Sequence, residues 1–285
     1  MTSTVLILGA SGKIGSHAAT AFRNAGWNVR LYDRKAGNMQ QAAMGADVIV
    51  NGLNPPNYHN WDKIIPEITQ QVIAAAKASR ATVIIPGNVY NYGVEQGPWD
   101  QNTPWRPVSR KGQIRVEMER AYKDSGVQTI VLRAGNFLDP EKNGDIGTLM
   151  LFRAIDKGAF TYPGDPNALQ AYCYLPDWAR AALALAERRA TLAQFEDVPL
   201  GGLALTASEF RAIASDVLDQ DLKMKAFPWW AMKLASPFWE LARELQEMRY
   251  LWSHHHSLST EKLHELVPGF QATPARTVIE TILKP

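Results

Sequence analysis

The first half of the chain alternates short apolar runs with longer segments of helical periodicity. The apolar runs, which we expect to be strands, lie at 5–8, 29–32, 47–50, 82–85 and 127–132. Between them apolar residues recur every three to four positions, which predicts amphipathic helices that begin near 13 and span 38–45, 62–79 and 109–125. Buried strands that alternate with such helices form a parallel sheet covered on both faces. The pattern therefore predicts an α/β fold with a doubly wound parallel sheet.

The second half predicts shorter and more mixed elements. We expect strands at 171–175 and 203–205, helices at 148–157, 176–189 and 206–218, and a last helix opened by Thr273 and Pro274. Thr206 and Glu209 have the spacing of a capping box, in which each side chain binds the backbone amide of the other. We therefore predict a sheet domain over 1–145, to which later segments return, and a smaller α+β cap over 146–285.

The turn after the first expected strand is punctuated by glycines. Gly9 permits a tight turn, Gly12 lets the backbone approach a diphosphate closely, and Gly15 lets helix and strand pack together. The free amides and positive dipole end of the following helix then face the anion. This pattern predicts a Rossmann-type dinucleotide site, to which the turn contributes Gly9, Ser11, Gly12, Lys13, Ile14 and Gly15.

An acidic residue, Asp33, ends the second expected strand. A carboxylate in this position accepts hydrogen bonds from the 2′-hydroxyl of the adenosine ribose and repels a 2′-phosphate, which favours NAD. Arg34 and Lys35 follow directly and could instead hold that phosphate. The sequence thus predicts NAD as the cofactor, contacted by Asp33 and Arg34, and leaves NADP as an open alternative.

Composition narrows the classes of function. The chain has 285 residues, of which 46% are hydrophobic and 20% charged, which is enough to bury a sizeable core. Its net charge of +2 is too small to predict binding to nucleic acid or to a membrane. The single cysteine, Cys173, fits a reducing compartment, and no apolar run approaches the ~20 residues that span a bilayer. We therefore expect a cytoplasmic globular protein whose partner is a small molecule.

Further motifs follow the glycine turn and Asp33 in a characteristic order. They are Val89-Tyr90, Arg133-Ala-Gly-Asn136, Pro176-Asp-Trp-Ala-Arg180 and Ser259-Thr-Glu-Lys262. Taken together, the motifs resemble those of the extended short-chain dehydrogenase/reductase family, the NAD-dependent epimerase/dehydratase group, along most of the chain. The resemblance implies a Rossmann-type domain over 1–145 that binds NAD(P) and a substrate-binding cap over 146–285. It also implies cofactor contacts from Leu53, Asn54 and Asn136, and it allows a homodimer.

The catalytic signature of that family is replaced in this chain. Family members carry a Tyr that exchanges a proton with the substrate and, four residues later, a Lys that binds the nicotinamide ribose. Lys111 and Arg115 stand in these two places, and Pro86 replaces the family's Ser or Thr partner. Arg115 could still hold the ribose, but its pKa above about 12 prevents it from moving a proton. Lys111 could donate a proton if burial and Arg115 lowered its pKa; the alternative is a solvated helix face or an ion pair with Glu119.

Other candidate catalytic groups lie on the loop that follows the expected strand at 82–85. Tyr90 and Tyr92 are candidate acids, and Asn88 is an uncharged donor that could orient a substrate oxygen. Gln170 stands where family members that act on nucleotide sugars commonly carry an Arg, which makes such a substrate less favoured. The predicted catalytic residues are therefore Lys111 or Tyr90 as the proton donor, with Asn88 and Arg115 as supporting groups.

Three consecutive histidines, His254, His255 and His256, do not predict a metal site. Consecutive side chains point in different directions, and no acidic or Cys partner lies nearby at ligand spacing. We expect these histidines to be exposed, with one of them lining a substrate pocket as the alternative.

Tryptophans are concentrated in two parts of the chain. The segment 227–252 carries acids among its basic residues, which favours packing against the sheet domain, or lining an apolar pocket, over binding to a membrane surface. The earlier loops place further tryptophans near the carboxyl edge of the sheet, where they could shape an apolar site or pack in the core: Trp61, Trp99 and Trp105.

The sequence supports three hypotheses for function. The leading one is an NAD(P)-dependent oxidoreductase that acts on a carbonyl or alcohol carbon of a small, rather apolar metabolite. The second is a non-catalytic NAD(P)-sensing regulator or binding module, because the signature residues are lost while the glycine turn and Asp33 remain. The third and weakest keeps the family's epimerase or dehydratase chemistry on a sugar.

Overall fold

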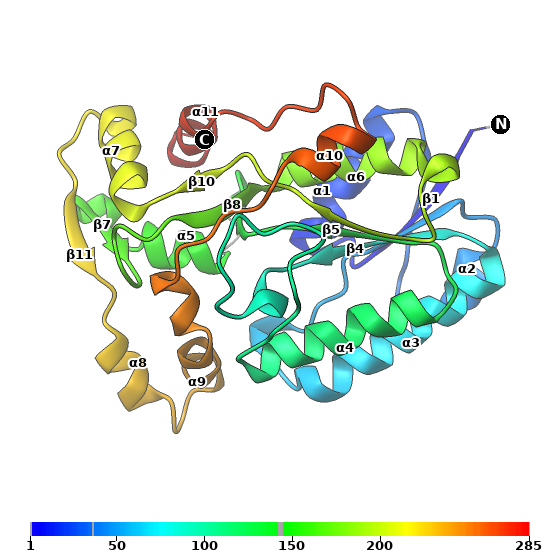
Figure 1. The fold of residues 1–285 in the computed structure, drawn as a ribbon, viewed down its shortest axis with the longest axis horizontal. Coiled ribbons are helices and arrows are strands. Elements are labelled where there is room, and N and C mark those ends of the chain that lie inside the picture. Colours follow the sequence, from blue (N-terminus) through cyan, green and yellow to red (C-terminus); the bar gives the residue numbers. More distant parts are fainter. Residues whose placement is uncertain (1, 36, 142–144, 285) are drawn as a thin grey trace.

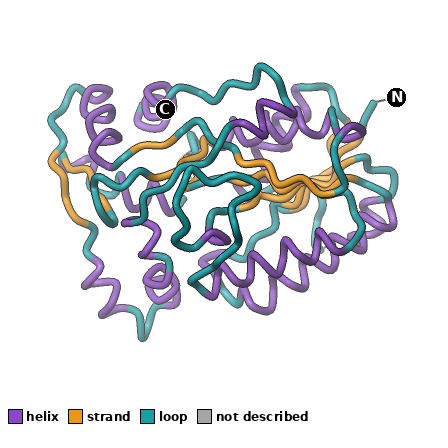
Figure 2. Tube along the Cα trace, in the orientation of Figure 1, coloured by secondary structure: helices purple, strands orange, loops and turns teal. Residues whose placement is uncertain are grey.

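The computed structural model describes residues 2–35, 37–141 and 145–284, and a six-stranded sheet lies at its centre (Figure 1, Figure 2). The strand order is β2-β1-β3-β4-β5-β9, and all neighbouring strands are parallel. The bounds are β1 (Thr4–Leu8), β2 (Asn28–Leu31), β3 (Val48–Asn51), β4 (Thr82–Gly87), β5 (Thr129–Arg133) and β9 (Phe195–Pro199). The predicted α/β class with a doubly wound parallel sheet is confirmed.

Helices cover both faces of this sheet (Figure 1). One face carries α1 (Lys13–Asn24) and α6 (Leu175–Glu187), and the other carries α2 (Met39–Ala43), α3 (Trp61–Ser79) and α4 (Arg110–Asp124). Side chains of β1 alternate between the two cores: Val5 and Ile7 belong to the first, and Leu6 and Leu8 to the second. A strand buried on both faces reads as a continuous apolar run, which is why the sequence predicts β1, β3, β4 and β5 well.

The C-terminal part of the chain builds a smaller lobe at one end of the sheet (Figure 1). One small sheet has the strand order β10 (Ala204–Leu205), β8 (Gln170–Tyr174), β6 (Asn136–Leu138). A second small sheet pairs β11 (Lys223–Ala226) with β7 (Ala159–Tyr162). The helices of this lobe are α5 (Ile146–Leu151), α7 (Ala207–Leu218), α8 (Trp229–Ala235), α9 (Glu240–Glu247) and α11 (Ala275–Leu283). The helix α10 (Glu261–Leu266) packs on the sheet domain beside β9. Within the described ranges, no helix combines the length and the apolar character needed to cross a membrane.

One strand of the central sheet, β9, is missing from the sequence prediction. It reads Phe-Glu-Asp-Val-Pro, and two acids in five residues do not suggest a buried strand. Glu196 and Asp197 are nevertheless buried, because the first pairs with Lys262 at 3.4 Å and the second with Arg133 at 2.6 Å. The segment 175–199, which contains α6 and β9, thus packs with the sheet domain. The short strands β6, β7 and β11 are also absent from the prediction.

Two expected helices differ in their bounds. The helix predicted over 148–157 is interrupted, since α5 ends at Leu151 and a separate 3-10 turn covers Ile155–Lys157. The last helix begins at Ala275, with Pro274 as its N-cap rather than its first residue. The capping box at the start of α7 is confirmed: Thr206 Oγ1 accepts from the Glu209 amide at 3.1 Å, and the Glu209 carboxylate accepts from the Thr206 amide at 2.8 Å.

Candidate functional site

The predicted cofactor turn joins β1 to α1, and its backbone packing excludes side chains. Gly9 has a φ of +72°, and a Cβ there would lie 2.8 Å from the carbonyl oxygen of Gly52. A Cβ on Gly15 would lie 2.2 Å from the carbonyl oxygen of Gly9. Gly12 is the N-cap of α1, and no side chain among the described residues caps this end of the helix. The turn therefore combines close backbone packing with uncontested helix amides, which is the arrangement that binds a dinucleotide diphosphate.

The residues predicted for the ribose follow the neighbouring strand. Asp33 and Arg34 are exposed just after β2, which pairs with β1 in parallel. The Asp33 carboxylate accepts a hydrogen bond of 2.8 Å from the amide of Lys35, which fixes its position. In the turn itself Ser11 is exposed and Ile14 is buried in the first core. The structure thus brings the predicted ribose residues and the glycine turn to the same edge of the sheet.

Lys13 turns toward acidic residues that lie after β6. Its ammonium lies 3.7 Å from Asp139 and 3.9 Å from Asp145. Burial lowers the pKa of Lys13, although both carboxylates oppose this shift. His17 Nε2 lies 3.0 Å from the other oxygen of Asp139, and Glu141 completes a group with the spacing of metal ligands. Because Lys13 already places a positive charge beside Asp139, we interpret this group as an ion-pair network between α1 and the segment after β6.

Arg115 of α4 lies against the loop that follows β3. Its guanidinium donates to Asn54 Oδ1 at 3.0 Å and lies over the Trp61 ring, 4.5 Å from its centroid. Burial lowers the pKa of Arg115, and its buried Nε–H has no hydrogen-bond partner within the part of the chain that the structure describes. Leu53, the residue before Asn54, is half-buried and donates its amide to the side chain of Asn51 at 3.1 Å. The helix position in which the family carries its Lys is therefore close to two residues predicted to contact the cofactor.

Two tyrosine hydroxyls meet beside Arg115. Tyr58, in the loop after β3, and Tyr90, in the loop after β4, have their hydroxyl oxygens 3.1 Å apart. Burial and the Tyr90 hydroxyl raise the pKa of Tyr58 well above its ordinary value, while the charge of Arg115 acts to lower it. Tyr92, the other candidate acid, donates its hydroxyl to the carbonyl of Asp100 at 3.0 Å. Tyr58 was missed in the sequence, because it lies 32 residues before Tyr90 and belongs to no motif.

A buried ion-pair network holds the loop after β4. Arg133, at the end of β5, is fully buried and lies 2.6 Å from carboxylate oxygens of both Glu119 and Asp197. Burial acts to lower the pKa of Arg133, but the two carboxylates raise it well above its ordinary value. Arg133 also donates to the backbone carbonyl of Asn88 at 2.6 Å, and the Asn88 side chain accepts from the Tyr90 amide at 3.0 Å. The loop that carries Asn88 and Tyr90 is thus anchored to α4, β5 and β9.

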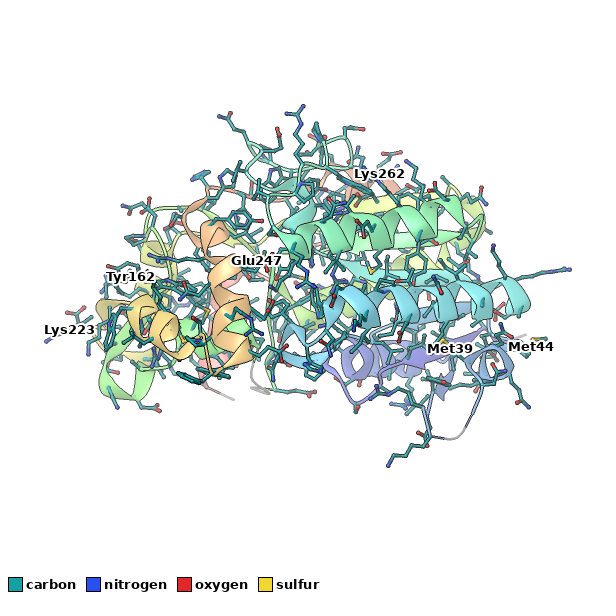
Figure 3. All side chains as sticks on the ribbon, turned by 90° about the horizontal axis from the view of Figure 1, so that it is seen from below. Met39, Met44, Tyr162, Lys223, Glu247 and Lys262 are labelled. Atoms are coloured by element: carbon teal, nitrogen blue, oxygen red, sulfur yellow. The ribbon has the colours of Figure 1, made fainter. Side chains whose placement is uncertain are left out.

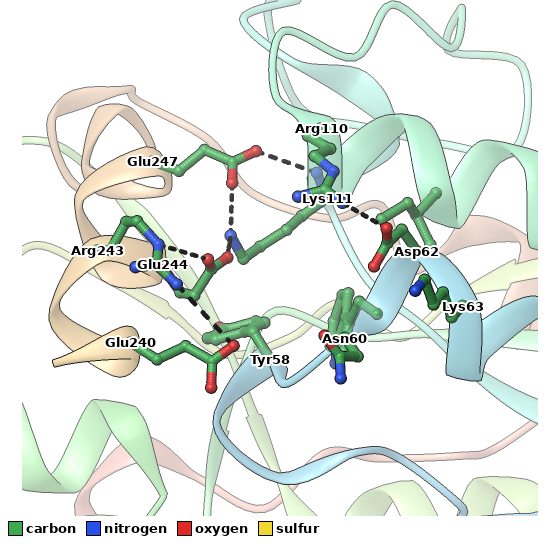
Figure 4. A pocket seen from close by; sticks show the side chains of 12 residues that line it. Tyr58, Asn60, Asp62, Lys63, Arg110, Lys111, Glu240, Arg243, Glu244 and Glu247 are labelled. Atoms are coloured by element: carbon green, nitrogen blue, oxygen red, sulfur yellow. Dashed lines mark hydrogen bonds and ion pairs between the residues drawn. The ribbon is translucent and has the colours of Figure 1, made fainter. Parts of the chain in front are cut away.

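Lys111 lies neither on a solvated helix face nor in an ion pair with Glu119, the two structural alternatives expected from the sequence. Its side chain is 2% exposed, and its ammonium contacts the carboxylates of Glu244 and Glu247 on α9 (Figure 4). Glu119, the ion-pair partner named from the sequence, binds Arg133 instead. Partial burial acts to raise the pKa of Glu247, but hydrogen bonds from Lys111 lower it. Lys111 therefore connects the sheet domain to the C-terminal lobe, at the boundary where Figure 3 places Glu247.

A cleft of about 270 Å³ opens beside this ion pair, between α3, α4 and α9 (Figure 4). Tyr58 and Trp61 line part of it. Most of the lining consists of charged side chains of both signs: Asp62, Lys63, Arg110, Lys111, Glu240, Arg243, Glu244 and Glu247. Such side chains offer partners to hydroxyl and other polar groups, so the lining does not match the rather apolar substrate expected from the sequence.

The histidines pack against the Trp-rich loop. Trp99 is fully buried, and its ring stacks on that of His256 with 4.6 Å between centroids. His256 is only 1% exposed, so the expected exposure is wrong for this residue, whereas His255 is exposed. Burial lowers the pKa of His256 to about 4. Gln170 is also buried and donates to the carbonyl of His254 at 2.9 Å.

Asn136, the last predicted cofactor residue, is half-buried at the start of β6. The preceding Gly135 lies against β8, where a Cβ would be 2.2 Å from the carbonyl oxygen of Ala171. The glycine of the Arg133–Asn136 motif thus allows β6 to approach β8 closely enough to pair with it.

Comparisons with known proteins identify the fold. No protein-family model matches this chain, and no curated protein sequence matches it. MoeE5 in complex with UDP-glucose and NAD superposes with a TM-score of 0.79 at 18% identity, over 99% of this chain and 98% of that chain. UDP-glucuronic acid 4-epimerase from Bacillus cereus, in complex with UDP-glucuronic acid and NAD, gives a TM-score of 0.75 at 16% identity, over 98% and 97%. RMD from Pseudomonas aeruginosa complexed with NADPH gives 0.74 at 14% identity, over 99% and 98%.

The chain therefore shares its fold with these NAD- or NADPH-bound structures over nearly its full length, at low sequence identity. Several of the similar structures are nucleotide-sugar epimerases.

Proposed function

We propose that this protein is an NAD(P)-dependent enzyme that oxidises a hydroxyl-bearing carbon of a polar, sugar-like metabolite or reduces the corresponding carbonyl. The observation that carries the proposal is the glycine turn, in which Gly9 and Gly15 leave no room for side chains next to an uncapped helix start. Asp33 follows β2 and Arg115 is on α4, and they would contact the two ribose groups of a dinucleotide.

Two observations support a polar substrate. The cleft beside Lys111 is lined mostly by charged side chains. Two structures with the same fold hold UDP-glucose or UDP-glucuronic acid. Gln170, however, has no charge with which to bind a diphosphate, and its side-chain amide donates a hydrogen bond to the backbone carbonyl of His254. We therefore propose a substrate that shares the hydroxyl-rich sugar of those ligands and does not require their nucleotide.

The chemistry assigned to the chain is proton transfer, since a bound nicotinamide would supply the hydride transfer. Tyr90 is the proposed proton donor and acceptor, because its hydroxyl is hydrogen-bonded to Tyr58 near the charge of Arg115. That charge would stabilise a phenolate formed when Tyr90 gives up its proton. The side chain of Asn88 would position Tyr90 by accepting a hydrogen bond from the Tyr90 backbone amide. Lys111, held between two carboxylates, would act as a structural residue.

Titration of the full chain with NAD⁺, NADH, NADP⁺ and NADPH, followed by tryptophan quenching and nicotinamide fluorescence, tests the proposal. We expect NAD⁺ and NADH to bind more tightly than the phosphorylated pair. A hydrogen bond to a charged group contributes about 1.5–3 kcal/mol, so Asp33→Ser should weaken NAD⁺ binding by roughly ten- to a hundredfold. If none of the four dinucleotides bound, the proposal would be refuted.

Arg115 provides a second test of the same site. Arg115→Met should weaken binding of NAD⁺, because it removes both the charge and the donors, and Arg115→Lys should retain part of the affinity. Arg110→Met is the matched control, since Arg110 is on the same helix and its side chain is 65% exposed. Equal affinities for all three variants and the parent protein would place the cofactor away from α4.

A non-catalytic dinucleotide sensor is the second candidate. It is favoured by Lys111, which stands in the place of the family's catalytic Tyr and is fully engaged by Glu244 and Glu247. This hypothesis predicts tight binding of NAD⁺ without turnover of sugars or polyols. A bound nicotinamide that becomes reduced when a substrate is added would exclude it.

A further inference from the structure

The C-terminal lobe contains a helical hairpin, formed by α8, α9 and the turn between them, that exposes large apolar side chains. Their exposed fractions are 71% for Trp230, 71% for Leu234, 95% for Phe238 and 50% for Trp239. We call these four residues the apolar tip. In Figure 1 the turn between α8 and α9 is the lowest point of the lobe and projects away from the central sheet. Clusters of exposed large apolar side chains mark contact surfaces on otherwise monomeric proteins.

The charges along this segment have one sign. Between Lys223 and Trp239 there are three lysines, all exposed, and no acidic residue: Lys223, Lys225 and Lys233. Figure 3 places Lys223 at the outer end of the lobe. The wider segment 227–252 also contains acidic residues. Three of them lie on the face of α9 that lines the cleft toward the sheet domain: Glu240, Glu244 and Glu247.

A hollow of about 640 Å³ adjoins the apolar tip on the other side of α9. Trp229 and Trp230 line it together with two basic side chains, Lys233 and Arg249. Arg249 lies over the Trp229 ring, 5.3 Å from its centroid. Asp165 is the acidic residue in the lining, so the basic groups outnumber it and the hollow can receive a phosphate group.

We propose that the apolar tip is a membrane-contact surface that inserts into the headgroup region of a bilayer containing anionic phospholipids. Trp and Phe side chains favour this interfacial region, where their rings are buried among acyl chains and headgroups. The three lysines would be attracted to the negative surface, and Lys233 and Arg249 would bind lipid phosphates beside the tip. Of the tryptophans in this segment, Trp229 and Trp252 are packed in the protein as expected, whereas Trp230 and Trp239 are exposed.

A second copy of the chain fits this surface less well. Three partly exposed aromatic side chains and one leucine offer on the order of 500 Å². A stable protein interface buries about 800 Å² on each partner. Lys233, which lies on α8 beside the tip, would also repel its counterpart on a second tip, whereas an anionic bilayer neutralises it.

Flotation of the full chain with phosphatidylcholine vesicles, with and without phosphatidylglycerol, tests the proposal. We expect binding to the anionic vesicles that weakens as salt is raised. Trp230→Ser with Phe238→Ser should abolish it, and Lys223→Gln with Lys233→Gln should reduce it roughly fivefold for each lysine removed. The control is Met44→Ser with Val108→Ser, which removes side chains that are 55% and 57% exposed elsewhere on the molecule.

The substituted side chains are exposed, so the variants should fold, and unchanged circular dichroism would verify this. Loss of vesicle binding in the tip variants but not in the control would support the proposal. The absence of binding by the parent protein would overturn it. Sedimentation velocity tests the alternative partner, a second copy of the chain. If the parent protein did not bind vesicles but formed a dimer, and Trp230→Ser with Phe238→Ser dissociated that dimer, the tip would be a dimer interface instead.

Discussion

Arg115 is a buried cation whose surroundings supply few partners. Among the described residues it forms no ion pair, and its hydrogen bonds join it to Asn54 and to the sulfur of Met118. Burying a charge without full compensation is unfavourable, so a residue of this kind is expected where a ligand completes its partners. The Tyr58–Tyr90 pair beside it has a similar character, since burial raises the pKa of Tyr58 and keeps its hydroxyl protonated. At the residue scale, these three side chains form the polar group that could replace the lost Tyr and Lys.

Tyr90→Phe tests the proposed proton transfer. Because the variant removes the group that exchanges a proton with the substrate, we expect kcat to fall by about 10²–10⁴ while the affinity for NAD⁺ is unchanged. Tyr58→Phe removes the hydrogen-bond partner of Tyr90 and should alter the pH profile of kcat with a smaller loss of rate. Tyr92→Phe is the control, as the Tyr92 hydroxyl is occupied by the carbonyl of Asp100. Full activity in Tyr90→Phe would assign the proton to another residue.

At the scale of elements, the sequence predicts the helices, strands and turns that are determined by residues close together in the chain. The bounds of α4 are predicted to within a residue, as 109–125 against Arg110–Asp124, and the glycine turn lies within seven residues of sequence. The partners of Lys111 lie 133 and 136 residues further along the chain, on a helix whose position depends on the whole C-terminal lobe. β9 was missed for the same reason: its acids are buried only because Lys262 and Arg133 reach them in the folded chain. Contacts of this kind have no local signature.

The contact between α4 and α9 predicts a measurable loss of stability. Lys111→Met leaves Glu244 and Glu247 without their cation, and breaking a buried pair costs about 3–5 kcal/mol. The two carboxylates are 17% and 28% exposed, so water reduces the loss to ~1–3 kcal/mol. Urea denaturation would measure it.

Adding Glu244→Gln and Glu247→Gln to that variant removes the unpaired charges and should restore part of the lost stability. Cofactor affinity should stay unchanged throughout, because Lys111 acts here as a connection between the lobes. A Lys111→Met protein as stable as the parent would contradict the structural role.

At the scale of the whole molecule, a buried layer of aromatic rings and backbone hydrogen bonds joins segments that are distant in sequence. The amide of Trp99 donates to the carbonyl of Ser257, and the amide of Ser259 donates to the carbonyl of Trp99, both at 2.8 Å. His256 stacks on Trp99 and bonds the carbonyl of His254 at 2.9 Å through Nδ1. A ring buried in this way is neutral, so protonation of His256 would disrupt the layer that fastens the loop 93–107 to the C-terminal chain.

His256 therefore predicts how stability responds to acid. Burial lowers its pKa from 6.5 to about 4, so below pH 6.5 the unfolded chain takes up a proton more readily than the folded one. The free energy of unfolding should be highest above pH 6.5 and fall toward pH 4, by about 3 kcal/mol from this residue.

His256→Phe keeps the stacked ring without a titrating group, and urea denaturation between pH 7.5 and 4.5 should show a weaker dependence on pH for this variant. His255→Phe is the control, because that side chain is exposed and its loss should leave the pH dependence of the parent protein. Parallel curves for His256→Phe and the parent protein would show that folding does not lower the pKa of His256.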